Sequence, residues 1–531
     1  MPSDCISFQK SGYFSALIND YLDQKESVQP LYHRFSNIDN FEAQIEEKKS
    51  NFNDSTKRDV LVSVLEAQYD KSNTSNATLS NIRLLSHSNT FTITTGHQLN
   101  LFSGPLYFLY KIIATINLTN ELQLKYPKNN FVPVYWMATE DHDFEEINYL
   151  NFKGKKFCWN RESTGPVGRL STEGLSDFIA IFSSELGNST HAETLKKLFK
   201  EAYLDHNNLA NATRHLVNAL FGEYGLVIID GDNAILKKQF IPYIKEELLQ
   251  QTGYKKVTET IQHFDSYPIQ VNPREINLFY IEDNLRERIV FEDGQYKVNQ
   301  TQRHFTEQEL LAEVDNHPEK FSPNVVMRPL YQEVILPNLA YIGGGGEIAY
   351  WLELQSYFEA VNVTFPILVV RNSVVLATEK QLKKGTNLGL NWSDLFKKQT
   401  DLINDKTKQL SEFSIDLSIL KEQLQQQFKT LYEITTKTDR SFEGAVKAQE
   451  VKQIKGLEQL EKRLLKAQKR KLEDVLTRIT ALQNELFPNQ SLQERQANFS
   501  EFYLENGNEL ITQLVAKIEP LSTHFAIVSL P

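Results

Sequence analysis

The sequence predicts an α/β protein in two parts: a core built on a doubly wound parallel sheet, and a C-terminal antiparallel α-helical coiled coil. Two observations lead to this fold class. Before about residue 390, short β-rich runs alternate with amphipathic stretches, an order typical of a parallel sheet whose strands are linked by helices. After that point, leucines recur at heptad spacing among Lys, Glu, Gln and Arg, which indicates a coiled coil.

The strands of the core are expected in four apolar runs: 91–95, 132–139, 226–230 and 365–370. Helical patterns follow the first three runs. After the first run, Pro105 suits the first position of a helix, because its fixed backbone angle and missing N–H are tolerated there. The apolar face of that helix would consist of Leu106, Leu109, Tyr110, Ile113 and Ile116.

Two stretches read as insertions into this core. Residues 151–205 follow the second strand without a strong strand of their own. Residues 250–325 are mixed and contain a pattern typical of a hairpin turned at Glu292-Asp293-Gly294. The predicted division is therefore a core over 1–390 that includes both insertions, a coiled-coil hairpin over 391–487, and a C-terminal segment over 488–531 that packs back on the core.

The coiled coil is predicted to have two arms of about four heptads each. The first seam contains Leu410, Phe413, Leu417, Leu420, Leu424 and Leu431. The second contains Leu457, Leu460, Leu464, Leu472, Val475, Ile479, Leu482 and Leu486, and Pro488 ends it. Because the link over 435–446 is short and polar, the arms should fold back on each other. They could bury each other's seam alone, but we favour a homodimer through this hairpin.

Composition narrows the function classes. The chain has 531 residues and a net charge of −11, which argues against a general nucleic-acid binder. Its two cysteines, Cys5 and Cys158, exclude a disulfide framework and a thiolate metal cluster. The N-terminus has neither the basic start nor the apolar stretch of a signal peptide, and no apolar run is long enough to span a bilayer. We therefore expect a cytoplasmic protein that binds neither nucleic acid nor membrane.

Polar residues stand where the first predicted strand ends, at Gly96-His97-Gln98. In open α/β sheets, ligands bind beyond the carboxyl ends of the strands. Gly96 would let the backbone approach a ligand, and His97 could donate a hydrogen bond to developing negative charge. A structural turn explains the same residues, and both interpretations stay open.

An acidic run follows the second strand. It contains Glu140, Asp141, His142 and Asp143. Such runs usually form a solvated helix start, where carboxylates favour the helix dipole. Directly after a buried strand, however, they could hold a substrate ammonium group or accept a proton from an attacking amine. Asp and His also bind metals, but these neighbours are too close in sequence to be assumed ligands together, so we predict no metal site.

The third candidate is a run of four glycines: Gly343, Gly344, Gly345 and Gly346. Ordering them costs backbone entropy, and a glycine loop that opens a helix can cradle a phosphate. It matches neither a P-loop nor a dinucleotide fingerprint, and a flexible turn is the alternative. Arg328 and Arg371, which adjoin strand-like runs, could each face an anion or form a surface ion pair.

Several longer motifs in the sequence resemble those of a known protein family. They are TTGHQLNLFSGPLYFLYK (94–111), PVYWMATEDHDFEEIN (133–148), SPNVVMRPLYQEVILPNLAYIGGGGEIAYW (322–351) and FPNQSLQERQANF (487–499), with PVGR (166–169) and YGLVIID (224–230) between them. In this order they resemble the bacillithiol-synthesis cysteine-adding enzymes, the BshC family. The resemblance covers nearly the whole chain. It implies a Rossmann-like parallel-sheet core with connecting insertions and a C-terminal coiled coil used for dimerisation.

The resemblance also implies a reaction. The family is assigned the last step of bacillithiol synthesis, in which L-cysteine is joined through its carboxyl group to the glucosamine amine of glucosaminyl-malate. Because a free carboxylate is a poor acyl donor, cysteine must be activated by the enzyme or arrive already activated. ATP with Mg²⁺ is compatible with such an activation but is not established. The related nucleotidyltransferases and class I aminoacyl-tRNA synthetases have a His-rich motif after the first strand, whereas only one His stands here. No counterpart of their Lys-Met-Ser-Lys-Ser motif is found, and Arg371-Asn372-Ser373 is the nearest candidate by location.

The expected site follows from these motifs. We predict catalytic roles for His97, Asp141 and Asp143. We predict substrate contacts from Gly96, Gln98, Asn100, Glu140, His142, Arg328, Gly343, Gly344, Gly345, Gly346, Arg371 and Ser373. Two other functions stay open: an adenylating enzyme similar to nucleotidyltransferases or class I aminoacyl-tRNA synthetases, and a non-catalytic coiled-coil scaffold.

Overall fold

The computed structural model describes residues 6–69, 74–264 and 267–531, which form two compact units. One unit consists of Ser7–Leu376 together with Leu492–Pro531, and the other contains Ala377–Ser491. The sequence analysis placed the change near residue 390, ahead of the first heptad leucine, Leu410. The structure places it earlier because α18 (Glu379–Asn387) and α19 (Trp392–Leu395) belong to the same unit as the coiled coil.

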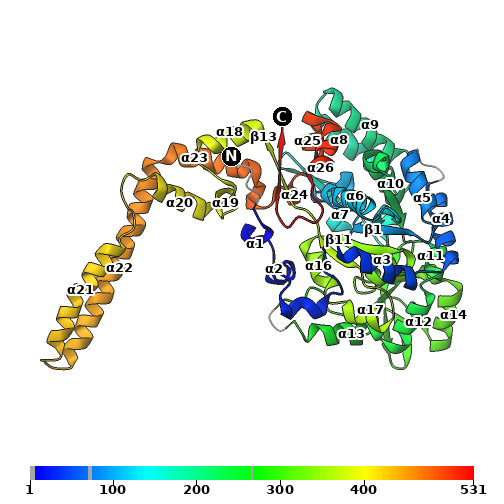
Figure 1. The fold of residues 1–531 in the computed structure, drawn as a ribbon, viewed down its shortest axis with the longest axis horizontal. Helices are drawn as coiled ribbons and strands as arrows, with labels where there is room; N and C mark the ends of the chain where they lie inside the picture. The colour runs from blue at the N-terminus through cyan, green and yellow to red at the C-terminus, as the bar shows by residue number, and fades with distance from the viewer. Residues whose placement is uncertain (1–5, 70–73, 265–266) are drawn as a thin grey trace. The chain divides into compact units, whose positions relative to one another are not determined.

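A five-stranded parallel sheet forms the centre of the first unit (Figure 1). Its strands, in spatial order, are β12 (Ile367–Val370), β11 (Asn338–Gly343), β1 (Thr90–His97), β2 (Asn130–Met137) and β5 (Val227–Asp230). The predicted α/β class is confirmed, and each of the four predicted runs overlaps one of these strands. The fifth, β11, leads into the glycine run. Strand order changes direction between β1 and β11, the place where such sheets bind ligands.

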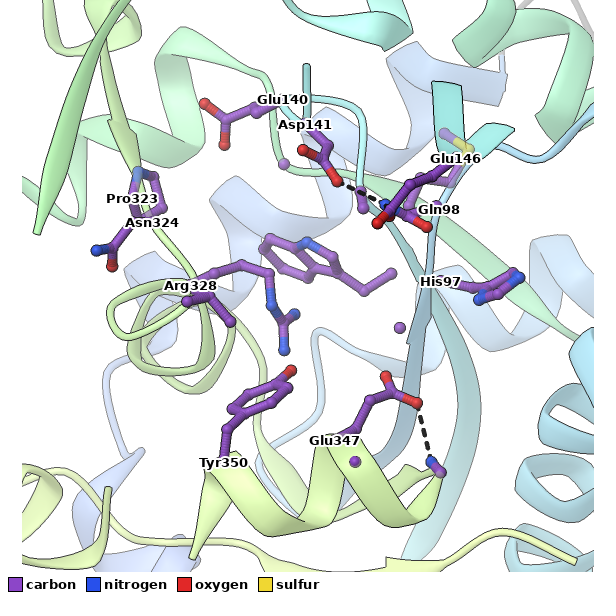
Figure 2. A pocket seen from close by; sticks show the side chains of 18 of the residues that line it. His97, Gln98, Glu140, Asp141, Glu146, Pro323, Asn324, Arg328, Glu347 and Tyr350 are labelled. Atoms are coloured by element: carbon purple, nitrogen blue, oxygen red, sulfur yellow. Dashed lines mark hydrogen bonds between the residues drawn. The ribbon is translucent and has the colours of Figure 1, made fainter. Parts of the chain in front are cut away.

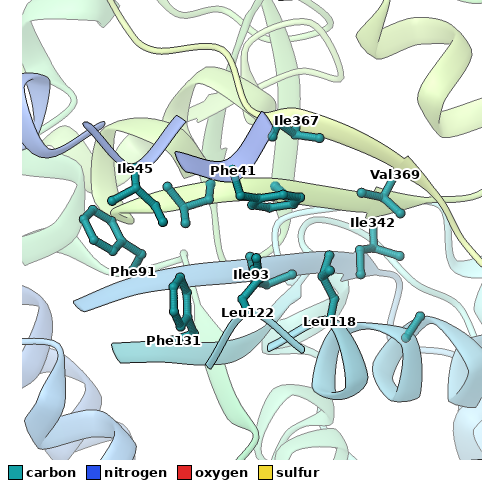
Figure 3. Packing of buried hydrophobic residues seen from close by; sticks show 13 residues of the cluster. Phe41, Ile45, Phe91, Ile93, Leu118, Leu122, Phe131, Ile342, Ile367 and Val369 are labelled. Carbon is teal, nitrogen blue, oxygen red and sulfur yellow. The ribbon is translucent and has the colours of Figure 1, made fainter. Parts of the chain in front are cut away.

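One face of this sheet is covered by α3 (Asn40–Asn51) and α6 (Tyr107–Lys125), which pack against β11 and against β1 and β2. Phe91 and Ile93 point to the same face because side chains alternate along a strand. They join a buried apolar cluster with residues of both helices (Figure 3). The other face carries polar groups: the Thr92 and Thr94 hydroxyls donate to Asn338 Oδ1, over 3.2 and 2.8 Å.

Helix α6 begins later than predicted. Pro105 is not its first residue; it forms an isolated β-bridge with Asn498, and the helix starts at Tyr107. Phe102, Ser103 and Gly104 all have positive φ values of 52°, 66° and 60°, so the chain makes a left-handed turn here instead of entering the helix directly. The Asn498 side-chain amide holds this turn by donating to the carbonyls of Phe102 and Gly104.

The C-terminal segment Leu492–Pro531 belongs to the first unit. Its helix α26 (Glu509–Lys517) packs on α6, where Asn117 Nδ2 donates to the carbonyls of Val515 and Ile518 over 2.8 and 2.7 Å. Because the sheet and α26 cover α6 from two sides, it is buried around most of its circumference, and not along the single face that the sequence suggested.

Both insertions contain more regular structure than expected. The first includes the hairpin β3 (Tyr149–Phe152) and β4 (Lys155–Cys158), followed by α8 (Leu175–Leu186) and α9 (Thr190–Leu204). The second contains α13 (Thr252–Ile261) and an antiparallel sheet in which β6 (Leu278–Glu282), β7 (Leu285–Glu292) and β8 (Gln295–Val298) are consecutive. The predicted turn is present between β7 and β8, where Asp293 and Gly294 both have positive φ. A second turn, between β6 and β7, was missed.

The second unit contains the helical hairpin. Helix α21 (Ser418–Thr435) packs against α22 (Ser441–Lys471), and α20 (Gln399–Leu410) packs against α23 (Glu473–Leu486). Residues 411–417 are not helical, so the first arm is interrupted within the predicted seam. The second arm is interrupted at Leu472, the residue between α22 and α23. No helix in the described parts of the chain is long and apolar enough to cross a membrane.

Candidate active site

A cavity of about 820 Å³ lies at the carboxyl ends of β1, β2 and β11. This is the position that the topology predicts for a ligand, and the volume suits a small molecule. The cavity's polar lining includes Gly96, His97, Gln98, Lys111, Glu140, Asp141, Glu146, Gln270, Arg274, Arg286, Arg288, Arg328, Glu347, Tyr350 and Arg371. Figure 2 shows ten of the lining residues with labels.

His97 is the last residue of β1, and its ring lies against two aromatic side chains of α6. The ring is stacked on Phe108 with centroids 4.8 Å apart and meets Tyr107 edge-on at 5.4 Å. Burial, together with the positive charges of Lys111 and Arg371, lowers the pKa of His97 well below its ordinary value, so the imidazole is neutral at physiological pH. Its buried Nε2 has no hydrogen-bond partner among the described residues. Figure 2 shows the ring directed away from Arg328 and Asp141.

Gln98 connects two carboxylates of the acidic run. Its Nε2 donates to Asp141 Oδ2 over 2.8 Å and to Glu146 Oε2 over 2.6 Å. Asp141 also accepts a hydrogen bond from the His142 backbone N–H at 2.8 Å. Burial alone would raise the pKa of Asp141, but the hydrogen bonds from His142 and Gln98 and the charge of Arg286 lower it. Asp141 is therefore a stable carboxylate, suited to hold a cation.

Glu140 lies beside Asp141 but in a different environment. It forms an ion pair with Lys237, whose side chain is fully buried. Burial raises the pKa of Glu140; Lys237 opposes this shift, and the charge of Asp232 adds to it. Asp232 in turn binds Arg169 through two hydrogen bonds of 2.7 and 2.8 Å. Adjacent carboxyls thus have pKa values shifted in opposite directions, an arrangement found where acid and base roles are separated.

Five residues of the predicted site lie outside the cavity lining, and three of them, Asp143, His142 and Asn100, belong to the loops that follow β1 and β2. Asp143 is exposed at the N-terminus of the short helix α7 (Phe144–Ile147), so its carboxylate is not brought to the cavity. His142 is held by Arg286, whose Nη1 lies 2.8 Å from its Nδ1. Asn100 donates to the backbone carbonyl of Glu146 over 3.0 Å and so supports the loop rather than the cavity surface. The sequence could not distinguish these because all three lie within a few residues of lining side chains.

The two candidate arginines differ in their partners. Arg371 is already neutralised: its Nη2 donates to Glu494 over 2.8 Å, and its Nη1 donates to the Asn372 carbonyl over 2.9 Å. Ser373 donates to the same Glu494 carboxylate over 3.1 Å and does not line the main cavity. The segment that contains both predicted residues therefore binds the C-terminal segment of the chain.

Arg328 has no such partner. It begins α15 (Arg328–Ile335), and its guanidinium lies over the Tyr341 ring, 5.6 Å from the centroid. Nη1 donates to Gln332 over 3.0 Å, whereas the buried Nη2 has no hydrogen-bond partner within the described ranges. No carboxylate of the described chain forms an ion pair with it. Burial lowers the pKa of Arg328, but Tyr350, Tyr341 and the charge of Glu347 outweigh that effect and raise it. Arg328 is therefore a stable cation in the cavity wall and is suited to bind an anionic group.

The glycine run ends β11 and opens α16 (Gly345–Trp351). Gly344, Gly345 and Gly346 line the cavity, whereas Gly343 ends the strand behind them. A Cβ on Gly343 would lie 3.0 Å from side-chain atoms of both Glu347 and Tyr341, so a larger residue would not fit without a shift. The Gly344 N–H already donates to Glu347 Oε2 over 2.9 Å. The protein's own carboxylate thus occupies part of the predicted anion cradle.

Lys111 and Glu347 were missed by the sequence analysis. Lys111 Nζ forms a 2.5 Å ion pair with Glu347 and donates to the Gly96 carbonyl over 2.6 Å. Glu347 also accepts from the Tyr341 hydroxyl over 2.8 Å. This pair joins α6, the end of β1 and the start of α16. On the predicted helix, Lys111 falls opposite the apolar face, where a lysine is expected to be solvated, so the pattern offered no signal for it.

Family models cover the chain from end to end. Residues 1–372 match the N-terminal Rossmann-like domain of bacillithiol biosynthesis BshC, and residues 374–530 match its C-terminal coiled-coil domain. The chain belongs to the BshC family. The resemblance seen in the sequence is thereby confirmed, as are the Rossmann-like core and the coiled-coil domain.

Relatives of the BshC family match over almost their whole length. A Flavobacterium johnsoniae protein is 66% identical over 100% of both chains, and one from Christiangramia forsetii is 56% identical over 100% of this chain and 99% of its own. A Bacillus cereus protein is 27% identical over 94% of this chain and 95% of its own. Each is named "Putative cysteine ligase BshC". These names agree with the prediction of a ligase.

Proposed function

We propose that the protein joins L-cysteine, through its carboxyl group, to the glucosamine amine of glucosaminyl-malate and so forms bacillithiol. Membership of the BshC family supports this proposal. The structural observation that supports it is the charge distribution in one cavity: carboxylates follow β2, and an arginine that forms no ion pair with any described carboxylate begins α15 (Figure 2). A substrate with an amine at one end and carboxylates at the other is complementary to both.

The two carboxylates after β2 have different proposed roles toward the substrate amine. An amine attacks an acyl group only when it is neutral, so it must first lose a proton. Asp141, with its lowered pKa, holds the ammonium form but is a weak base. Glu140, whose pKa burial raises, is the stronger proton acceptor of the two. Asp143, which is exposed, has no part in this revised proposal.

The malyl carboxylates are proposed to bind Arg328, with Arg274 and Arg288 lining the same cavity. Carboxylates form paired hydrogen bonds with the planar guanidinium group. Arg371 is not needed for this role because Glu494 already neutralises it. His97, being neutral, would donate a single hydrogen bond to an anionic oxygen on the activated cysteine.

For the activation of cysteine, we propose ATP with Mg²⁺ as the first reagents to test. ATP would convert the carboxylate into a better acyl donor. Because Arg328 is assigned to the malyl carboxylates, the residues that would hold the phosphates of ATP are His97 and the amides of Gly345 and Gly346. The Gly344 amide is less suitable because Glu347 accepts its hydrogen bond and would repel a phosphate.

The deciding experiment is product formation. The purified protein would be incubated with glucosaminyl-malate, L-cysteine, ATP and Mg²⁺, and the mixture analysed by mass spectrometry for bacillithiol and for AMP or ADP. Product supports the ligase, and the nucleotide released separates acyl-adenylate from acyl-phosphate chemistry. No product despite sugar binding by calorimetry would mean that a different cysteine donor is required. Pyrophosphate exchange without bacillithiol would favour the adenylating enzyme, and no binding of either substrate would favour the scaffold.

A further inference from the structure

An irregular segment between α13 and β6, here called the strap (residues 267–276), forms part of the cavity wall. Its contributions to that wall are Gln270, Asn272, Arg274 and Ile276. The strap contains neither helix nor strand, so its backbone amides are not held by regular structure. At its start, the Tyr267 hydroxyl donates to Asp20 Oδ2 over 2.6 Å, and Asp20 pairs with Lys25 at 2.6 Å.

The middle of the strap is held by one carboxylate. Glu353, two residues beyond α16, is only 1% exposed. Its Oε1 accepts from the Gln270 N–H over 2.7 Å and from the Val271 N–H over 3.4 Å. Its buried Oε2 has no hydrogen-bond partner in the described part of the chain, and none of the described cations forms an ion pair with Glu353. The strap amides are therefore its principal compensation for burial.

Gln270 occupies a special place along this strap. It lines the main cavity, and it also lines a smaller cavity of about 190 Å³ that shares Gly345, Gly346 and Arg371 with the main one. A displacement of the Gln270 backbone would change the wall of both cavities. The hydrogen bond from its N–H to Glu353 is thus the contact that sets the shape of this boundary.

We propose that Glu353 is a positioning residue that holds the middle of the strap in place, so that Gln270 completes the substrate cavity; at the other end, Asn277 holds the Arg274 backbone through two hydrogen bonds. Glu353 does not line the cavity and acts only through the strap. Its effect on turnover rests on the proposed ligase function, whereas its effect on the strap does not. The two can therefore be tested separately.

Titration of Glu353 gives a readout that a purely structural contact would not have. Burial raises the pKa of Glu353 to about 7, and the Gln270 and Val271 amides lower it only in part; no charged side chain of the described chain contributes to this shift. The strap itself contains Arg274 and Glu275, and the charged pair of Asp20 with Lys25 contacts its Tyr267 end. When the strap is in place, the Glu353 carboxyl binds its proton more tightly than a solvated carboxyl would. A rise in pH from the ordinary Glu range to about 7 should therefore favour release of the strap.

Hydrogen exchange on the full-length protein, followed by mass spectrometry, tests the proposal directly. Glu353→Gln keeps an acceptor oxygen but cannot ionise, and Glu353→Ala removes the acceptor. Glu501→Gln is the matched control, because Glu501 also accepts a backbone N–H, from Lys153 over 2.9 Å, and has a pKa raised by burial, yet does not line the cavity. Below about pH 6, where Glu353 is protonated, the strap amides of Glu353→Ala should exchange about fivefold faster than in the wild type, the factor that loss of a neutral hydrogen bond implies.

The pH dependence completes the test. Strap protection in the wild type, corrected for intrinsic exchange, should fall between about pH 5 and pH 8, and Glu353→Gln should show no such fall. Unchanged strap exchange in Glu353→Ala would overturn the proposal whether or not the protein is a ligase. Faster exchange with a raised KM for the sugar substrate supports it; faster exchange with an unchanged KM would overturn the role in completing the cavity.

Discussion

At the scale of single residues, the two candidate arginines, Arg328 and Arg371, differ in the partners of their guanidinium groups. Both adjoin strand ends, so sequence alone treats them alike. Glu494 neutralises Arg371, whereas Arg328 keeps a buried Nη2 without a partner. What distinguishes them is a contact with a residue more than a hundred positions away in the chain, which no local pattern reveals.

Arg328→Ala should therefore weaken substrate binding. A hydrogen bond between charged groups contributes about 1.5–3 kcal/mol, so KM for the sugar substrate should rise by about 10–100-fold. Arg328→Lys should recover only part of this because a lysine lacks the planar fork. Steady-state kinetics would measure both. Arg303→Ala is the control: Arg303 is exposed and pairs with Glu282 away from the cavity. An equal KM for Arg328→Ala and the control would remove Arg328 from the site.

His97 gives a second prediction at this scale. Because burial and the charges of Lys111 and Arg371 lower its pKa, it should stay neutral across the range where free histidine titrates, near pH 6.5. Histidine-selective NMR, with His97→Ala to assign the resonance, would measure this. Below about pH 6.5 the unfolded chain binds a proton that the fold resists, so this histidine should make the protein less stable as pH falls. A midpoint near 6.5 for the His97 resonance would contradict the burial argument.

His97→Ala should lower turnover without unfolding the protein.

At the scale of elements, a buried ion pair links the helix that carries Arg328 to the rest of the core. Lys48 of α3 lies 3.3 Å from Glu333 of α15, and both side chains are almost fully buried. Glu333 also accepts from Asn338 at the start of β11, over 2.7 Å. Three elements that are distant in sequence thus meet at the end of β11 opposite the cavity.

Lys48→Ala should destabilise the protein by about 3–5 kcal/mol because it leaves a buried carboxylate without its cation. Burial raises the pKa of Glu333 and Lys48 opposes that shift, so its removal should raise the pKa further. The unfolded carboxyl ionises near pH 4.3, and the loss of stability should therefore grow as the pH rises above that value. Urea unfolding at two pH values would measure it. Lys49→Ala, at the exposed neighbouring position, should change little. Equal unfolding of the two variants would contradict the prediction.

The same scale explains what the sequence could predict. Buried strands are predicted from apolar runs. Polar residues that follow these runs predict the edge of the sheet at which a ligand binds, and this reasoning found His97, Gln98 and Asp141. Strap residues and arginines such as Arg286 were not found, because they reach the cavity only through the packing of an insertion onto the core. Pro105 was misplaced because the left-handed turn before it depends on Asn498, near the other end of the chain.

At the scale of the whole molecule, we predict that the chain forms a dimer through the helical hairpin. Helices α21 and α22 leave part of their seam uncovered: Leu420 is 47% exposed and Leu460 is 54% exposed. Both line a groove on the hairpin, together with Leu424 and Leu457. Contiguous exposed leucines are unusual on a monomer's surface, and a second copy of a coiled coil offers a matching seam.

The double substitution Leu420→Glu with Leu460→Glu should therefore convert a dimer into a monomer, because the charges would have to be desolvated at the interface. Glutamate is a good helix former, so the hairpin should still fold. Light scattering coupled to size-exclusion chromatography would measure the mass. Leu124→Glu is the control, since Leu124 is 85% exposed on α6, outside the hairpin unit. A wild-type mass of one chain, or a double variant that keeps the dimer mass, would mean that the two arms only cover each other.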